Sequence, residues 1–146
     1  MKEQVIYSLD EVSAVAERVK AYIQGCKVVT LTGSLGAGKT TLMHALMAQY
    51  GVQEQVTSPT FTYVNRYTNK EKDLFYHFDL YRLSSADDLY ALGFDEYLHE
   101  PHAKLFIEWP SVALMLLQTV PTCHITIDYH GLDKRILTIT KEDAHE

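Results

Sequence analysis

The sequence predicts an α/β domain with three layers, in which helices cover both faces of a mixed, mostly parallel central sheet. Two observations carry this prediction. Short β-branched and aromatic runs alternate along the chain with stretches whose apolar residues recur at helical spacing. The last two such runs, 123–129 and 135–140, instead follow one another across a short polar turn. They therefore predict a C-terminal antiparallel hairpin.

The length and composition favour one globular domain. The chain has 146 residues, and we treat residues 1–146 as a single domain. Hydrophobic residues make up 47% and charged residues 22%, which is typical of a globular rather than a disordered protein. No apolar run approaches the ~18 residues that a membrane span requires. The first residues also lack the basic and apolar blocks of a secretory signal, so we expect no membrane association and a cytoplasmic location.

The charge balance argues against independent nucleic-acid binding. The chain has 13 Lys and Arg against 19 Asp and Glu, for a net charge of −6. Proteins that bind nucleic acids by themselves usually carry a basic surface that neutralises phosphates. If this chain acts near RNA, we expect another protein to hold the RNA.

The two cysteines, Cys26 and Cys123, are too few for a disulfide framework or for a metal site of their own. Both lie in apolar strand-like runs. We therefore expect two buried thiols in a reducing cytosol.

The first elements are a strand at 4–8 and a helix that follows it. Ser8 and Glu11 have the spacing of a capping box, in which each side chain satisfies a backbone N–H of the other residue. The β-branched run 27–32 predicts a central strand that is buried on both faces. It ends in a glycine-rich turn, after which residues 40–50 are expected to form a helix.

The second half begins with a predicted hairpin, because strand patterns at 60–68 and 73–79 flank a polar turn. A short helix at 84–92 ends at a glycine, and another apolar strand is expected at 104–109. Pro110 then suits the first position of one more helix.

The segment that carries chemistry is GSLGAGKT, at residues 33–40. It matches G-x-x-x-x-G-K-[ST] at every fixed position and lies between a buried strand and a helix, as a P-loop does. Glycines let backbone N–H groups turn toward phosphate oxygens, and the following helix directs its positive end at them. We expect Lys39 to contact the β- and γ-phosphates and the Thr40 hydroxyl to complete a Mg²⁺ shell. The predicted fold is therefore P-loop NTPase-like, and the predicted phosphate-binding residues are Gly33, Ser34, Leu35, Gly36, Ala37, Gly38, Lys39 and Thr40.

Two acidic residues end later strands. Asp79 follows Leu74–Phe78, 40 residues after Lys39, and fits a Walker-B role near the magnesium. The alternative is that Asp79 only caps the next turn. Glu108 ends the following apolar strand, and strand ends in a parallel sheet cluster where ligands bind. Glu108 would hold the metal or orient the attacking water; the alternative is a surface glutamate.

A hydroxyl-rich segment lies between the P-loop helix and the strand of Asp79. Ser58, Thr60 and Thr62 occupy the place of a nucleotide-sensing switch loop, although a plain turn and strand would also fit this spacing. Trp109 is either a core residue or a neighbour of the nucleotide, and His77 is interpreted as an ordinary strand residue.

The nucleobase is less well indicated. No N/T-K-x-D follows on a late strand, as guanine recognition would require, and this absence favours ATP. The similar run at 69–73 misses the pattern by one residue and precedes Asp79. His99 and His102 have a spacing that could hold a metal, but a solvated loop is the simpler interpretation.

Five stretches of the chain resemble the TsaE family (formerly YjeE), the small bacterial P-loop ATPases of tRNA threonylcarbamoyladenosine biosynthesis. The stretches are GSLGAGKTTL at 33–42, TSPTFT at 57–62, HFDLYRL at 77–83, LGFDEYL at 92–98 and IEWP at 107–110. They keep the family's order and rough spacing across about residues 4–140. A P-loop alone is unspecific, whereas HFDLYRL followed by IEW is highly specific.

The resemblance implies ATP binding at 33–41, which adds Thr41 to the nucleotide site. It implies Mg²⁺ on Thr40 and Glu108, and a Walker-B role for Asp79. It also implies that Ser58–Thr62 is the switch segment and that Trp109 is functionally sensitive.

The family acts with TsaB and TsaD, where ATP hydrolysis supports cycles of threonylcarbamoyl transfer to adenosine 37 of certain tRNAs. Because TsaD performs the transfer, the resemblance implies an accessory ATPase that meets tRNA only through the complex. Ser34 stands where the family often has an acid, a departure that leaves the P-loop pattern intact.

Two other functions fit parts of the sequence. A small-molecule P-loop kinase would need an acceptor pocket and an arginine-bearing lid, but after Glu108 the chain offers a short helix and a hairpin with Arg135 alone. A nucleotide-gated binding module would signal by its bound state and hydrolyse little. No arginine is an evident arginine finger, so we expect low activity alone and a partner that completes the site.

Overall fold

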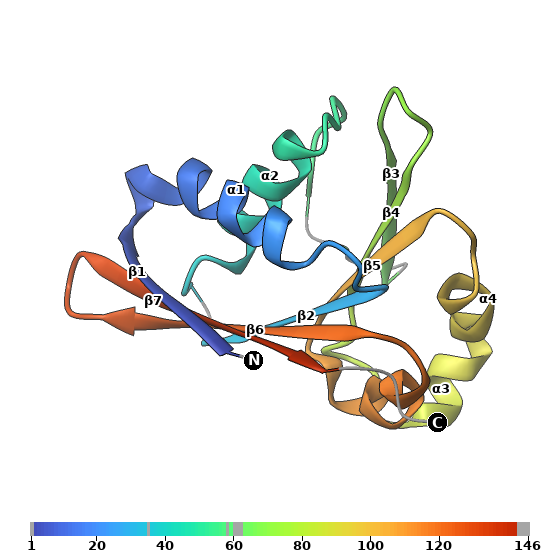
Figure 1. Cartoon of the computed structure of the whole chain (residues 1–146). Helices are drawn as coiled ribbons and strands as arrows, with labels where there is room; N and C mark the ends of the chain where they lie inside the picture. Colours follow the sequence, from blue (N-terminus) through green and yellow to red (C-terminus); the bar gives the residue numbers. More distant parts are fainter. Residues whose placement is uncertain (1, 35, 58, 60–62, 143–146) are drawn as a thin grey trace.

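Seven strands form one mixed sheet in the computed structural model, which describes residues 2–34, 36–57, 59 and 63–142. The strand order is β1-β7-β6-β2-β5-β4-β3. Parallel pairing joins β6, β2, β5 and β4 at the centre, and antiparallel pairing joins the strands at both edges (Figure 1). The strands are β1 (Lys2–Ser8), β2 (Val28–Gly33), β3 (Val64–Thr68), β4 (Leu74–Asp79), β5 (Ala103–Glu108), β6 (Thr122–His130) and β7 (Lys134–Glu142).

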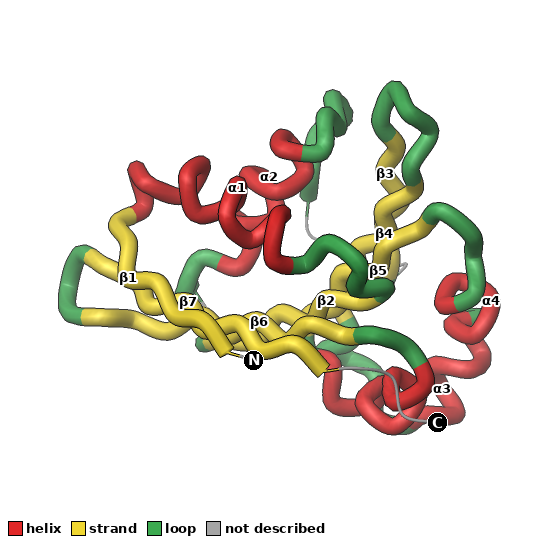
Figure 2. Tube along the Cα trace, in the orientation of Figure 1, coloured by secondary structure: helices red, strands yellow, loops and turns green. Residues whose placement is uncertain are grey.

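Helices cover both faces of this sheet, which confirms the three predicted layers. Figure 2 shows α1 and α2 on one face and α3 and α4 on the other. The helical segments are η1 (Leu9–Glu11), α1 (Val12–Tyr22), α2 (Lys39–Gln49), α3 (Ala86–Ala91), α4 (Phe94–Leu98) and η2 (Pro110–Thr119), of which η1 and η2 are 3₁₀ helices. The predicted C-terminal hairpin is confirmed as β6 and β7. Among the helices of the described residues, α4 was not predicted by the periodicity. No helix in the described part of the chain combines the length and apolar character needed to cross a bilayer.

Alternation along the central strands decides which side chains face which helices. On β2, Val29 and Leu31 join the core beneath α1 and α2, whereas Val28 joins the core beneath α3, α4 and η2. On β5, Phe106 faces α1 and α2, and Ile107 faces the opposite side. Glu108 lies two residues after Phe106 on β5 and therefore points to the same face of the sheet, the one that α2 covers.

The predicted capping box connects β1 to the first helix. The backbone N–H of Ser8 donates to the Glu11 carboxylate at 2.9 Å, and the Ser8 hydroxyl donates to the same oxygen at 2.7 Å. These two bonds, the backbone one first, hold the pKa of Glu11 below its ordinary value. The chain enters α1 through the 3₁₀ turn η1 rather than directly.

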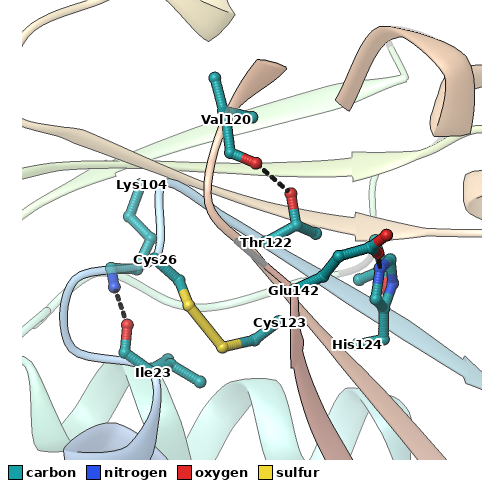
Figure 3. The surroundings of a disulfide bond; sticks show 9 residues. Ile23, Cys26, Lys104, Val120, Thr122, Cys123, His124 and Glu142 are labelled. Carbon is teal, nitrogen blue, oxygen red and sulfur yellow. Dashed lines mark hydrogen bonds and ion pairs between the residues drawn. A yellow bond between two sulfur atoms is a disulfide. The ribbon is translucent and has the colours of Figure 1, made fainter. Parts of the chain in front are cut away.

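Cys26 and Cys123 form a disulfide, so the expectation of two separate thiols is wrong (Figure 3). Cys26 lies just before β2, and Cys123 is the second residue of the neighbouring strand β6. Their Cα atoms are 6.2 Å apart although 97 residues separate them in the chain. Both side chains are buried, as predicted. Each run by itself shows only a buried cysteine, and the strand order alone brings the two together.

Lys104, near the start of β5, extends its amine to the end of α1. Its Nζ donates to the backbone carbonyl of Ile23 at 2.7 Å, where the helix leaves a carbonyl without an intrahelical partner. Burial, and to a smaller extent the nearby charge of Lys141, lowers the pKa of Lys104 to about 8.

This shift predicts that stability rises with pH between about 8 and 10.5. In that range the unfolded chain keeps a proton on Lys104 that the folded protein has lost, so the free energy of unfolding increases as pH rises. We expect Lys104→Met to flatten the rise by up to ~1.4 kcal/mol per pH unit. Urea unfolding across this range measures the effect. Lys70→Met, at an exposed lysine of the β3–β4 turn, is the control and should keep the wild-type slope. An unchanged slope in Lys104→Met would contradict the prediction.

Candidate functional site

The glycine-rich turn connects the end of β2 to the start of α2, as predicted. Gly33 ends β2 with a φ of +151°, and a Cβ there would lie 2.3 Å from the backbone oxygen of Ile127 on β6. Gly38 precedes α2 in the left-handed region, with a φ of +108°. Only glycine adopts both conformations without strain. The loop is therefore pressed against the next strand and turned so that α2 begins at Lys39.

The N-terminus of α2 is suited to bind an anion. Its first backbone N–H groups lack intrahelical acceptors, and the helix dipole makes this end positive. Lys39 is buried, and its amine donates to the carbonyl of Gly33 at 3.0 Å. Thr40 and Thr41 follow in the same turn. One predicted phosphate-binding residue, Leu35, lies outside the part of the chain that the structure describes.

Asp79 and Glu108 stand side by side at the ends of β4 and β5. They are register partners in the parallel pairing of these strands, and Glu108 is also paired with Leu31 of β2, two residues before the P-loop. Alternation places both carboxylates on the face that α2 covers. The structure thus brings together the P-loop and both predicted acidic residues at one edge of the sheet.

Glu108 is 4% exposed, so it is not the surface glutamate of the alternative interpretation. Its Oε2 lies 2.6 Å from Nε2 of His77, whose side chain is also buried. His77 is indeed a strand residue, but sequence reasoning missed this contact. The signal was available, because His77 precedes Asp79 by two residues on one strand and must share its face.

Asp79 also makes the contact expected from the alternative interpretation, in which it caps the turn after its strand. Its Oδ1 accepts a hydrogen bond from the backbone N–H of Tyr81 at 3.0 Å. Asp79 therefore caps the turn after β4 while its strand position keeps it beside Glu108. The two interpretations of this residue are compatible.

Trp109 lies beside the P-loop lysine rather than in the core. Its side chain is 40% exposed, and the amine of Lys39 is 4.5 Å from its ring centroid. The Tyr81 ring is 4.9 Å from it on the turn after β4. Its backbone is in the left-handed region, with a φ of 54°, where a tryptophan is held only by the surrounding structure.

Arg135 of β7 is a second residue that sequence reasoning missed. Its Nε donates to the carbonyl of Ala37 in the P-loop at 3.1 Å, and its guanidinium lies 4.3 Å from the ring centroid of Tyr129. The contact joins residues 98 positions apart, so no local pattern could have indicated it. Arg135 braces the loop from the side of the hairpin.

The predicted switch residues Ser58, Thr60 and Thr62 lie outside the described residues. The segment before them is anchored, because the carbonyl of Thr57 accepts hydrogen bonds from Asn65 and Tyr67 of β3.

A buried strand, a P-loop and a helix in this order, with carboxylates on the two adjacent parallel strands, define a P-loop NTPase-like protein. The comparisons with known proteins agree. The sequence profile described as "Threonylcarbamoyl adenosine biosynthesis protein TsaE" matches residues 6–137. The chain therefore belongs to the TsaE family, as its motifs predicted.

Individual relatives are similar over most of the chain. The tRNA threonylcarbamoyladenosine biosynthesis protein TsaE of Bacillus subtilis is 36% identical over 133 residues, covering 90% of this chain and 80% of that protein. The protein of the same name from Haemophilus influenzae is 37% identical over 123 residues, covering 84% and 76%. The crystal structure of Bacillus subtilis YdiB has a TM-score of 0.68 and 30% identity, covering 95% of this chain and 86% of that one.

The close approach at Gly33 predicts a large effect of a single methyl group. In Gly33→Ala the new Cβ would meet rigid backbone of β6, so we expect the free energy of unfolding to fall by about 3 kcal/mol or more. Gly51→Ala is the matched control, because Gly51 also has a positive φ but open space around it. There we expect a loss of about 1 kcal/mol from backbone strain alone. Urea unfolding measures both, and equal losses would contradict the role assigned to the contact with Ile127.

Proposed function

We propose that the protein is a magnesium-dependent subunit that binds and hydrolyses ATP and supports tRNA N6-threonylcarbamoyladenosine modification. The observation that carries the proposal is the meeting of the P-loop with Asp79 and Glu108 on two adjacent strand ends. Membership of the TsaE family supports the place in tRNA modification.

The donor set of the site suits Mg²⁺. A threonine hydroxyl and carboxylate oxygens are hard ligands of the kind this ion prefers, and Thr40, Asp79 and Glu108 offer them. When bound, Mg²⁺ would neutralise charge on the phosphate oxygens of ATP. Backbone N–H groups of residues 33–41 would bind the phosphates.

Hydrolysis would proceed by in-line attack of water on the γ-phosphorus, which forms one P–O bond and breaks the bond to the β-phosphate oxygen. ADP and inorganic phosphate leave, and the proton of the water passes to an acceptor at the site or to solvent. Lys39 and the P-loop N–H groups would stabilise the developing negative charge. Glu108 would hold the metal or orient the water.

A partner would complete the site. Arg135 is the arginine that contacts the P-loop among the described residues, and its guanidinium donates to carbonyls of Ala37 and Lys134. Such a brace does not serve as an arginine finger. We therefore propose low activity alone and stimulation by TsaB and TsaD, with tRNA met only through that complex in the cytoplasm.

Phosphate release from ATP tests this function. We expect TsaB and TsaD to stimulate the wild-type protein, and Lys39→Ala or Glu108→Gln to lower the stimulated rate by about 10²–10³. Lys70→Ala, at the exposed β3–β4 turn, should retain the wild-type rate. Fast hydrolysis without partners would contradict the gated ATPase. Phosphate transferred to a small acceptor would instead favour the kinase.

The contact between Lys39 and Trp109 predicts an optical signal. A lysine that moves to the phosphates must leave the indole ring, and Trp109 is the single tryptophan of the chain. We therefore expect its fluorescence to change in a saturable way with ATP and Mg²⁺ but not with adenosine. Constant emission, while calorimetry shows that ATP binds, would contradict a movement of Lys39.

A further inference from the structure

Glu108, one of the two acids at the strand ends, is hydrogen-bonded to the buried imidazole of His77. His77 and Glu108 are 1% and 4% exposed, and they lie on neighbouring parallel strands. The 2.6 Å between Nε2 and Oε2 is a short hydrogen bond. By alternation His77 shares the face of Asp79, so its ring lies beneath α2, on the P-loop side of the sheet.

The other ring nitrogen of His77 indicates the direction of this bond. Nδ1 is buried and has no hydrogen-bond partner among the described residues. A buried N–H without an acceptor is costly, so we assign the proton to Nε2, which donates to Glu108. The imidazole then has one polar partner, and that partner is the carboxylate.

The contact also divides the two oxygens of Glu108. Oε2 is occupied by His77, which leaves Oε1 as the oxygen of Glu108 that His77 does not contact. A carboxylate anchored by one oxygen cannot rotate freely, so the other oxygen keeps a constant direction. Outer groups that orient a ligating carboxylate in this way commonly affect metal affinity or activity by 10–100-fold.

Packing alone does not account for histidine at this position. Two neighbours of His77 on the same face are buried apolar side chains. They are Phe75, two residues earlier on β4, and Phe106, the register partner of His77 on β5. An apolar residue at 77 would leave no orphaned nitrogen. Unsatisfied buried groups of this kind are few in native proteins and commonly mark functional sites.

We propose that His77 is a positioning residue that holds Glu108 so that Oε1 is presented to the magnesium ion or the attacking water. This proposal rests on the proposed ATPase function and adds a residue to it. His77 itself touches neither nucleotide nor metal.

Three variants separate the position of the donor from the presence of a polar group. His77→Gln places an amide N–H four bonds from Cα, where Nε2 stands in histidine. His77→Asn places it three bonds away, at the level of Nδ1. His77→Leu removes it. Phe75→Leu is the control for a loss of packing in the same core. Each variant is first checked for a cooperative thermal unfolding transition.

The readouts are kcat and KM for ATP with TsaB and TsaD present, each measured across a range of Mg²⁺ concentrations. We expect His77→Leu and His77→Asn to lower kcat or raise the required Mg²⁺ by about 10–100-fold, with KM for ATP within about threefold of wild type at saturating Mg²⁺. His77→Gln should restore most of the loss, and Phe75→Leu should retain the wild-type kcat.

The outcomes distinguish this proposal from the function on which it rests. A wild-type protein without ATP turnover would contradict the proposed function, and with it this proposal. If the wild-type protein turns over ATP and both His77→Leu and His77→Asn keep its kcat and Mg²⁺ requirement, the role of His77 is overturned while the ATPase function stands. Equal damage in His77→Gln and His77→Asn would also overturn it. If His77→Leu does not fold, the pair of amide variants decides.

Discussion

Parallel pairing of β2, β5 and β4 holds the carboxyl ends of these three strands together, and the candidate site depends on this pairing. β2 leads into the P-loop, β5 ends at Glu108 and β4 ends at Asp79. Because all three strands run in one direction, their carboxyl ends meet where α2 begins. The pairing in turn depends on burial of both faces, since apolar side chains of β2 and β5 fill the cores above and below the sheet.

The C-terminal hairpin does more than extend the sheet. β6 lies directly against the P-loop at Gly33, and β7 contributes the guanidinium that binds the Ala37 carbonyl. The loop is thus held from outside by backbone contact and by one charged side chain. These contacts explain how a glycine-rich segment keeps a defined shape.

The polar groups of the site are largely paired with one another. The Lys39 amine donates to the Gly33 carbonyl and lies over the Trp109 ring, and Glu108 is hydrogen-bonded to His77. Each pairing satisfies a buried polar group that would otherwise be costly. In the proposed function, ATP would exchange the contacts of Lys39 for contacts to phosphate and so would affect the aromatic pair of Trp109 and Tyr81 at the surface.

The sequence by itself determined the local features: the P-loop at 33–40, the strand and the helix that flank it, and the acids at strand ends. Each of these depends on residues close together in the chain, so periodicity and spacing reveal them. Only the tertiary structure decided the disulfide of Cys26 and Cys123, the contact of His77 with Glu108 and the brace of Arg135. These contacts join residues 31 to 98 positions apart, and they exist only because the strand order places distant segments side by side.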